Sequence, residues 1–224
     1  MSISLVEHLA DPHPEKRRTA LYQVLSSSER SESLCIAVVD RLSDSEGVIR
    51  ELASEVLQDL VCNYPDLVPK LIAGLRDSSP IVRANILRVI QRMTTIPDTA
   101  MSILPKMLSD TSLLVRISAA HAVWKHLHIS EPVIPVVLTG LSSNHRDTII
   151  RAAQLAAEMA GYGDLLIDPL SRILAREDAS IRGNILYALL QVDNDKQRLQ
   201  QLASRFINDP DTLVRYTVSR IMRG

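Results

Sequence analysis

Residues 108–119 read LSDTSLLVRISA, and versions of this segment occur seven times in the chain. Its arginine recurs at intervals of 33, 33, 33, 35, 31 and 33 residues, as Arg17, Arg50, Arg83, Arg116, Arg151, Arg182 and Arg215. An Ile or Val directly precedes six of these arginines, and an aspartate lies six residues before five of them. A local pattern with a nearly constant period of this length identifies the chain as a repeat array.

Each repeat has the pattern of two helices joined by a polar turn. In the third repeat Pro80 ends the turn, and the apolar positions Val82, Ile86, Val89 and Ile90 follow at helical spacing. This spacing puts apolar side chains on one face of a helix, whereas the two-residue alternation of a strand is absent. The turns are rich in Asp, Ser and Pro, which are typical of a helix start.

The pattern predicts fourteen helices in seven hairpins within one domain, residues 1–224. The expected first helices are Ser2–Leu9, Ser31–Leu42, Tyr64–Leu75, Asp98–Leu108, Pro132–Leu141, Gly163–Leu174 and Asp195–Ile207. The expected second helices are Pro14–Ser26, Gly47–Cys62, Pro80–Met93, Leu113–Leu127, Asp147–Ala160, Ala179–Val192 and Thr212–Met222. The turn before Arg151 is two residues longer than the others, which predicts a change of curvature near residues 141–165.

The repeated pattern Leu-x-Asp-x-x-x-x-Val-Arg-x-x-Ala, as in Leu108–Ala119, resembles the short HEAT-like repeat named after the phycobilisome lyases. The resemblance extends over all seven units, although the first unit has Lys16 where the apolar residue belongs. The ankyrin Thr-Pro-Leu-His signature and the tetratricopeptide Trp and Leu-Gly pattern are both missing. The resemblance implies an all-α fold, a right-handed α-solenoid of about seven helical hairpins.

In HEAT-like proteins the repeated aspartates and arginines resemble an internal ladder, and the same role is implied here. One planar guanidinium can bind turn carboxylates and carbonyls of its own or the adjacent repeat. The alternative is a row of arginines facing a phosphate backbone, which requires exposed side chains; the apolar residue before most of the arginines argues against it. The predicted ladder residues are Asp11, Arg17, Asp44, Arg50, Asp77, Arg83, Asp110, Arg116, Arg151, Arg182, Asp209 and Arg215.

Composition limits the classes of partner and the cellular location. A formal net charge of −1 lacks the general attraction to phosphate that nucleic-acid-binding proteins use, so nucleic acid is disfavoured. No apolar stretch is long enough to span a membrane. The first residues have neither the basic head nor the apolar run of a secretory signal. Together with Cys35 and Cys62, which are expected to be buried thiols, this predicts a cytoplasmic protein.

In HEAT solenoids the second helices line the concave surface, so a ligand is expected at second-helix positions that do not point inward. We expect these positions one and five residues after each repeated arginine, in two rows that also contain Ala84, Ile117, Ala152, Ala156 and Gly183. The rows mix both signs of charge with tyrosine and arginine, which dominate protein interfaces. Repeat four adds Trp124, as either a partner anchor or packing between repeats. The binding candidates are Arg18, Tyr22, Glu55, Arg88, His121, Trp124, Lys125, Tyr187, Tyr216 and Arg220.

These features favour a non-enzymatic scaffold that binds a protein segment, with no cofactor and no metal. His121 and His128 are about 10 Å apart along a helix and lack a third ligand. The repeat subtype suggests a bilin lyase or chromophore-handling protein as the alternative, and a HEAT-like DNA glycosylase is less favoured. HEAT-like hydroxylases hold iron with His-Glu pairs, and the chain has no His-Glu dipeptide. The terminal units resemble ordinary repeats rather than polar caps, which leaves self-association through an end of the array open.

Overall fold

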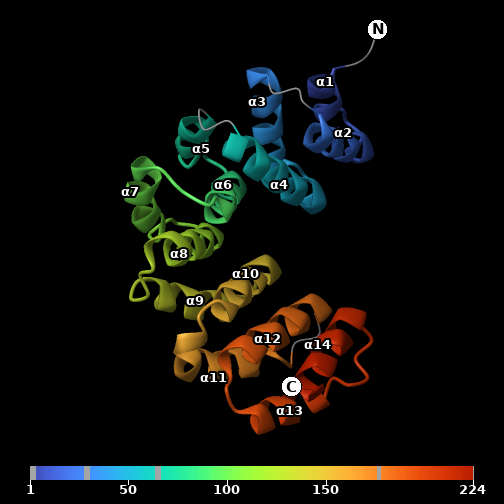
Figure 1. Ribbon diagram of the computed structural model, residues 1–224, viewed down its shortest axis with the longest axis vertical. Coiled ribbons are helices and arrows are strands. Elements are labelled where there is room, and N and C mark those ends of the chain that lie inside the picture. Colours follow the sequence, from blue (N-terminus) through green and yellow to red (C-terminus); the bar gives the residue numbers. More distant parts are fainter. Residues whose placement is uncertain (1–3, 28–30, 64–66, 176–177, 224) are drawn as a thin grey trace. The chain divides into compact units, whose positions relative to one another are not determined.

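The computed structural model describes residues 4–27, 31–63, 67–175 and 178–223, without the side chains of Cys62 and Asn63. These residues form fourteen α-helices joined as hairpins, and none of them is in a strand (Figure 1). The predicted all-α repeat fold is therefore confirmed. Among the described residues, none of the helices has the length and apolar composition needed to cross a bilayer.

The helices alternate between first and second members of a hairpin. The first helices are α1 (Leu5–Leu9), α3 (Glu32–Asp40), α5 (Val68–Gly74), α7 (Asp98–Met107), α9 (Val133–Leu141), α11 (Gly163–Ile173) and α13 (Lys196–Ser204). The second helices are α2 (Pro14–Ser26), α4 (Gly47–Asn63), α6 (Pro80–Arg92), α8 (Leu113–Leu127), α10 (Arg146–Ala157), α12 (Ala179–Val192) and α14 (Thr212–Arg223).

The predicted bounds of α2, α8 and α12 are confirmed to the residue. Several predicted helices are too long at the carboxyl end. The helix expected to reach Leu42 becomes a 3-10 helix at Arg41–Ser43, and α13 ends at Ser204 instead of Ile207. The last carbonyls of a helix have no intrahelical donor, so tighter turns often replace the final α-turn. Parts of the predicted segments Ser2–Leu9 and Tyr64–Leu75 lie outside the described residues.

The irregular fifth repeat ends in a close approach between two helix termini. Helix α10 stops at Ala157 instead of the predicted Ala160, and a 3-10 helix at Ala160–Tyr162 leads into α11. A Cβ added at Gly163 would lie 2.5 Å from the backbone oxygen of Val192, the last residue of α12. Glycine is therefore needed at this position because a side chain would collide with the backbone at the end of α12, the second helix of the same hairpin.

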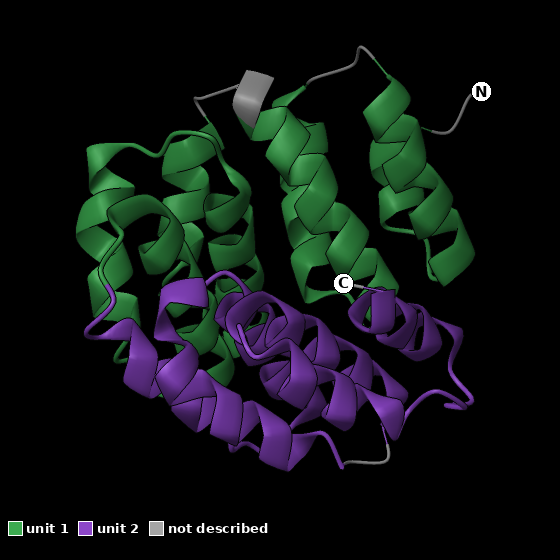
Figure 2. Ribbon diagram, turned by 60° about the horizontal axis from the view of Figure 1, so that its bottom comes forward, with its two compact units in different colours: residues 1–129 green, residues 130–224 purple. Residues whose placement is uncertain are grey.

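The chain divides into two compact units, residues 1–129 and 130–224, coloured separately in Figure 2. In the first unit the second helices α2, α4, α6 and α8 pack against one another in order, and in the second α10, α12 and α14 do the same. Their buried side chains are mainly Leu, Ile, Val and Ala. Full burial of one such large side chain stabilises the fold by about 1.5–3 kcal/mol, so repeated stacking supplies the main stabilising energy.

In six turns within the described part of the chain, the side chain at the repeated aspartate position accepts from the backbone N–H two residues later. Asp44 Oδ1 accepts from Glu46 at 3.0 Å, Asp77 Oδ1 from Ser79 at 2.7 Å and Asp110 Oδ1 from Ser112 at 2.8 Å. In the fifth repeat the hydroxyl of Ser143 makes the same bond to His145 N–H at 3.0 Å. A serine thus keeps the turn geometry of an aspartate, because both offer an oxygen at short reach.

The repeated arginines bind the carbonyls of their own turn. In five of the turns that the structure describes, Nη1 donates to the backbone oxygens six and five residues earlier, at 2.6 to 3.2 Å. These arginines are Arg17, Arg50, Arg83, Arg116 and Arg215. Each guanidinium therefore holds the polar turn against the start of its second helix.

Arg17, Arg83 and Arg182 also bind the turn of the following repeat. Nε and Nη2 donate to both carboxylate oxygens of an aspartate 27 residues later, at 2.7 to 2.9 Å. The pairs are Arg17 with Asp44, Arg83 with Asp110 and Arg182 with Asp209. For the first pair the side chains are only 9% and 2% exposed. Two parallel bonds to one carboxylate fix the orientation of successive turns.

The ladder is not continuous. Arg50 keeps the hydrogen bonds to its own turn. The structure describes both Arg50 and Asp77, but no hydrogen bond joins them, and Asp77 is exposed. In the second unit Asp178 is bound by Arg146, whose Nε lies 2.8 Å from Asp178 Oδ2. Arg151 is half-buried in α10. A further pair, outside the predicted ladder, joins Arg198 of α13 to both oxygens of the buried Asp193 at 2.6 and 2.8 Å.

Comparing Arg83→Met with Arg50→Met tests the contribution of the inter-repeat pair. Both variants lose two turn bonds, but only Arg83→Met leaves the partly buried carboxylate of Asp110 without its arginine. We expect Arg83→Met to lower the free energy of unfolding by about 3 kcal/mol and Arg50→Met by about 1 kcal/mol. Urea unfolding monitored by circular dichroism measures both. Equal losses would contradict a special role of the pair.

The same pairs predict acid sensitivity. The bonds from Arg182 hold the pKa of Asp209 below its ordinary value, although burial of the carboxyl opposes this. A lowered folded-state pKa contributes stability that is present above the unfolded carboxyl pKa of about 4 and is lost as pH falls through the folded-state value. We expect the urea midpoint of the wild type to fall more steeply from pH 6 to about pH 3 than that of Arg182→Met/Asp209→Asn. Parallel curves would show that this pair contributes nothing to acid sensitivity.

Candidate functional site

In each compact unit the candidate site is the set of solvent-accessible side chains on its second helices, called the second-helix face below. Residues four apart on a helix lie on one side of it. In the first unit this places Arg18 and Tyr22 together on α2, and His121 and Lys125 together on α8. The second unit contributes Tyr187 from α12, and Tyr216 and Arg220 from α14.

Most predicted candidates are accessible. The tyrosines Tyr22, Tyr187 and Tyr216 are 57%, 44% and 63% exposed. The charged residues Arg18, Glu55, Lys125 and Arg220 are also exposed. Partial burial is found for Arg88, His121 and Trp124.

The two predicted rows are wrong in the middle of the array. Ala84, Ile117, Ala152 and Ala156 occupy row positions but are fully buried. These residues lie on α6, α8 and α10, and α6 packs closely on α8 as α10 does on α12. Small or apolar side chains allow neighbouring helices to approach, so these positions become part of the core instead of the surface.

Opposite charges gather on neighbouring helices of the first unit. Helix α4 carries Glu51, Glu55 and Asp59 at four-residue spacing, all exposed, and α6 carries Arg88 and Arg92 at the same spacing. Asp59 and Arg92 are not among the binding candidates predicted from the sequence. Their position, four residues after Glu55 and Arg88, is the signal that would have found them.

An ion pair joins the charged helices. Arg88 Nη2 donates to Glu51 Oε1, from α6 to α4. Arg92 is half-buried and has no hydrogen-bond or ion-pair partner among the residues that the structure describes. Burial lowers the pKa of Arg92, as does the nearby charge of Arg88, while Glu51 and Glu55 oppose this. Arg92 therefore carries a partly desolvated charge that is incompletely balanced within the chain.

Two polar contacts join α6 to α8. Gln91 Nε2 lies 3.3 Å from His121 Nε2, and because an amide nitrogen only donates, His121 accepts. His126 Nε2 lies 2.9 Å from the backbone oxygen of Ile90 and donates to it. His128 ends α8 in the left-handed conformation, with φ of 54°. The imidazoles of repeat four thus have different surroundings, and no group of three potential ligands suited to a metal occurs among the described residues.

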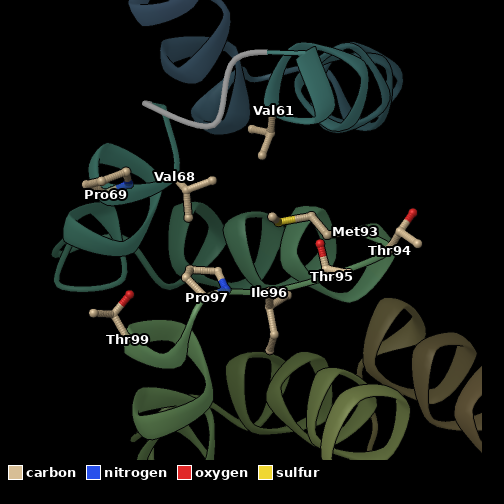
Figure 3. Close-up of a pocket in the computed structure, with 9 residues that line it drawn as sticks. All are labelled: Val61, Val68, Pro69, Met93, Thr94, Thr95, Ile96, Pro97 and Thr99. Atoms are coloured by element: carbon tan, nitrogen blue, oxygen red, sulfur yellow. The ribbon is translucent and has the colours of Figure 1, made fainter.

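A pocket in the first unit lies away from the predicted candidates. It has a volume of about 620 Å³, and Figure 3 shows Val61, Val68 and Met93 around it, from α4, α5 and the end of α6. Its described lining contains no ionisable side chain. Such a lining can hold an apolar group but offers no acid or base for catalysis. No periodic signal in the sequence marks this pocket.

Comparisons with known proteins agree on the fold. Two engineered proteins of known structure each share 16% sequence identity with the chain at a TM-score of 0.52. The alignments cover 91% of this chain and 94% of the first protein, and 98% of this chain and 66% of the second. Human deoxyhypusine hydroxylase, solved with glycerol, shares 16% identity at a TM-score of 0.50, over 98% of this chain and 93% of its own. At this identity the likeness shows the fold alone. A sequence comparison with curated proteins gives no significant match.

A model of HEAT repeats matches the chain twice, at residues 36–124 and 68–158. The two matches together span residues 36–158, more than half of the chain, and contain Arg50, Arg83, Arg116 and Arg151 with their turns. The chain therefore belongs to the HEAT repeat family.

Proposed function

We propose that this protein is a non-enzymatic scaffold that binds a segment of a protein partner along the second-helix face. In HEAT solenoids this face is the concave one. The observation that carries the proposal is the exposure of three tyrosines, Tyr22, Tyr187 and Tyr216, on second helices. Tyrosine offers a large contact area and a polar group at a low entropic cost, and it is enriched among the residues that dominate binding energy.

The engagement of the arginine ladder supports a protein partner over a phosphate backbone. Arg17, Arg83 and Arg182 each bind a carboxylate of the following turn. These guanidinium groups are not available to phosphate without breaking partly buried pairs, which costs about 3–5 kcal/mol each. The charges that remain on the second-helix face have both signs, as protein interfaces do and phosphate-binding tracks do not. The proposed setting is the cytoplasm, as the sequence predicts.

The test uses two variants, one in each compact unit. We expect Arg88→Glu/His121→Ala in the first unit and Tyr187→Ala/Tyr216→Ala in the second to weaken binding of the partner. Interface tyrosines and arginines contribute about 1.4 kcal/mol or more each, so at least one variant should raise the Kd about tenfold or more. The partner is first captured from native lysate by the wild type, and its affinity for each variant is then measured with purified proteins by calorimetry.

The matched control replaces exposed apolar residues on the first helices, as Ile36→Ala and Leu165→Ala, which are 47% and 49% exposed in the wild type. These changes should leave the Kd within about twofold, since scattered surface contacts contribute little. Loss of binding only in the control variants would place the partner on the first helices. Turnover of a substrate by the purified protein would refute the non-enzymatic role.

A further inference from the structure

The basic residues on α6 differ in how their charge is balanced. Arg88 is paired with Glu51 of α4, whereas Arg92, one helical turn later, has no ion-pair partner within the described part of the chain. Arg92 is also half-buried, so water solvates it less than a fully exposed arginine. A partly desolvated guanidinium without a carboxylate binds an incoming carboxylate more strongly than a fully hydrated one does.

A second cation occupies the equivalent place on the neighbouring helix. Arg92 follows the repeated Arg83 by nine residues, and Lys125 follows Arg116 by nine. Lys125 is exposed and forms no ion pair with any residue that the structure describes. Helices α6 and α8 pack together. The contact between Gln91 of α6 and His121 of α8 shows that the sides of the two helices that carry these residues meet. Packed helix axes are about 8–10 Å apart, so the two side chains start from backbones separated by roughly that distance.

The helix before α6 carries the opposite charge at this position. Asp59 of α4 is 33 residues before Arg92, and Glu55 lies one turn before Asp59. Helices α4 and α6 are also packed together. The equivalent positions on α4, α6 and α8 are therefore acidic, basic and basic, in the order Asp59, Arg92 and Lys125. A polyphosphate chain would meet repulsion at α4, whereas a protein segment can change its charge from one residue to the next.

We propose that the partner is an extended protein segment with two acidic residues facing Arg92 and Lys125 and a basic residue facing Asp59. The proposal rests on the scaffold function above and adds the chemistry of the partner. A segment in the polyproline II conformation has three residues per turn and rises about 3.1 Å per residue, so side chains three residues apart lie on one side of it, roughly 9 Å apart, which matches the spacing of packed helices. The predicted recognition pattern is basic-x-x-acidic-x-x-acidic, read in either direction of the chain.

The test is a selection from a displayed library of random short peptides on the full-length protein. Four forms are compared: the wild type, Arg92→Gln/Lys125→Gln, Arg92→Glu/Lys125→Glu, and a control, Arg76→Gln/Lys106→Gln, which removes two exposed cations elsewhere. We expect the wild type and the control to enrich Asp and Glu three residues apart. The Gln variant should lose this preference, and the Glu variant should instead enrich Lys and Arg at those places.

The Kd of the most strongly enriched acidic peptide is then measured for each form of the protein, which gives the contribution of each charge to binding. Each removed charge should raise its Kd about tenfold, and the difference between wild type and Gln variant should shrink when salt is raised. Circular dichroism and thermal unfolding confirm that the variants remain folded. An acidic preference that survives in the Gln variant would overturn the proposal, as would enrichment with no charge preference.

The remaining outcomes separate this inference from the scaffold function. Selected peptides that lack acidic residues but lose binding to Arg88→Glu/His121→Ala would overturn the inference and support the scaffold. Peptides whose binding is insensitive to every second-helix variant, or no selected peptide at all, would count against both. Single-stranded DNA that displaces the acidic peptide and shows the same dependence on Arg92 and Lys125 would assign the site to nucleic acid and overturn the proposal.

Discussion

The fold depends on a guanidinium group that must be shared between two turns. Arg17 donates to two carbonyls of its own turn and to both oxygens of Asp44 in the next repeat, where the two side chains are almost completely buried. A buried charge is tolerated only when it is paired and hydrogen-bonded. Each pair therefore fixes the start of one second helix relative to the turn of the next hairpin. Stacking of apolar helix faces supplies the energy, and the pair fixes the register.

This division of roles explains how a repeat protein can be regular inside and varied outside. The ladder uses the aspartate and the arginine near each turn, and the core uses the Leu, Ile, Val and Ala of both helices. The second-helix face has no such structural requirement where it meets solvent. Tyr22, Glu55, Arg88 and Tyr187 occupy equivalent positions of different repeats although their chemistry differs. Variation at equivalent positions of a fixed framework is how repeat proteins create a binding surface.

The sequence predicted the framework better than the surface, for physical reasons. Helix starts are marked by residue types that favour them, and α2, α8 and α12 have the predicted bounds. Pro14 is the first residue of α2, and the side chain of Asp178 caps α12. Helix ends depend on tertiary packing, and α10 ended early before the close approach of Gly163 to Val192. Whether Ala84 or Ile117 faces solvent depends on the distance between neighbouring helices. That distance cannot be read from the periodicity of a single helix. The missing contact between Arg50 and Asp77 is likewise invisible in a pattern that both residues satisfy.

Net charge conceals how the charges are arranged. The chain is nearly neutral, with a formal charge of −1, because cations and anions are almost equal in number. Many of them are bound to one another: Asp44 and Asp110 to ladder arginines, and Glu51 to Arg88. A charge that is paired inside the protein contributes little to recognition, since a partner must first break the pair. A partner meets the charges that are not paired inside the protein. On α6 and α8 the side chains of Arg92 and Lys125 make the unpaired charge positive. The identity of the unpaired charges, rather than their total, therefore determines which kind of partner segment this face can bind.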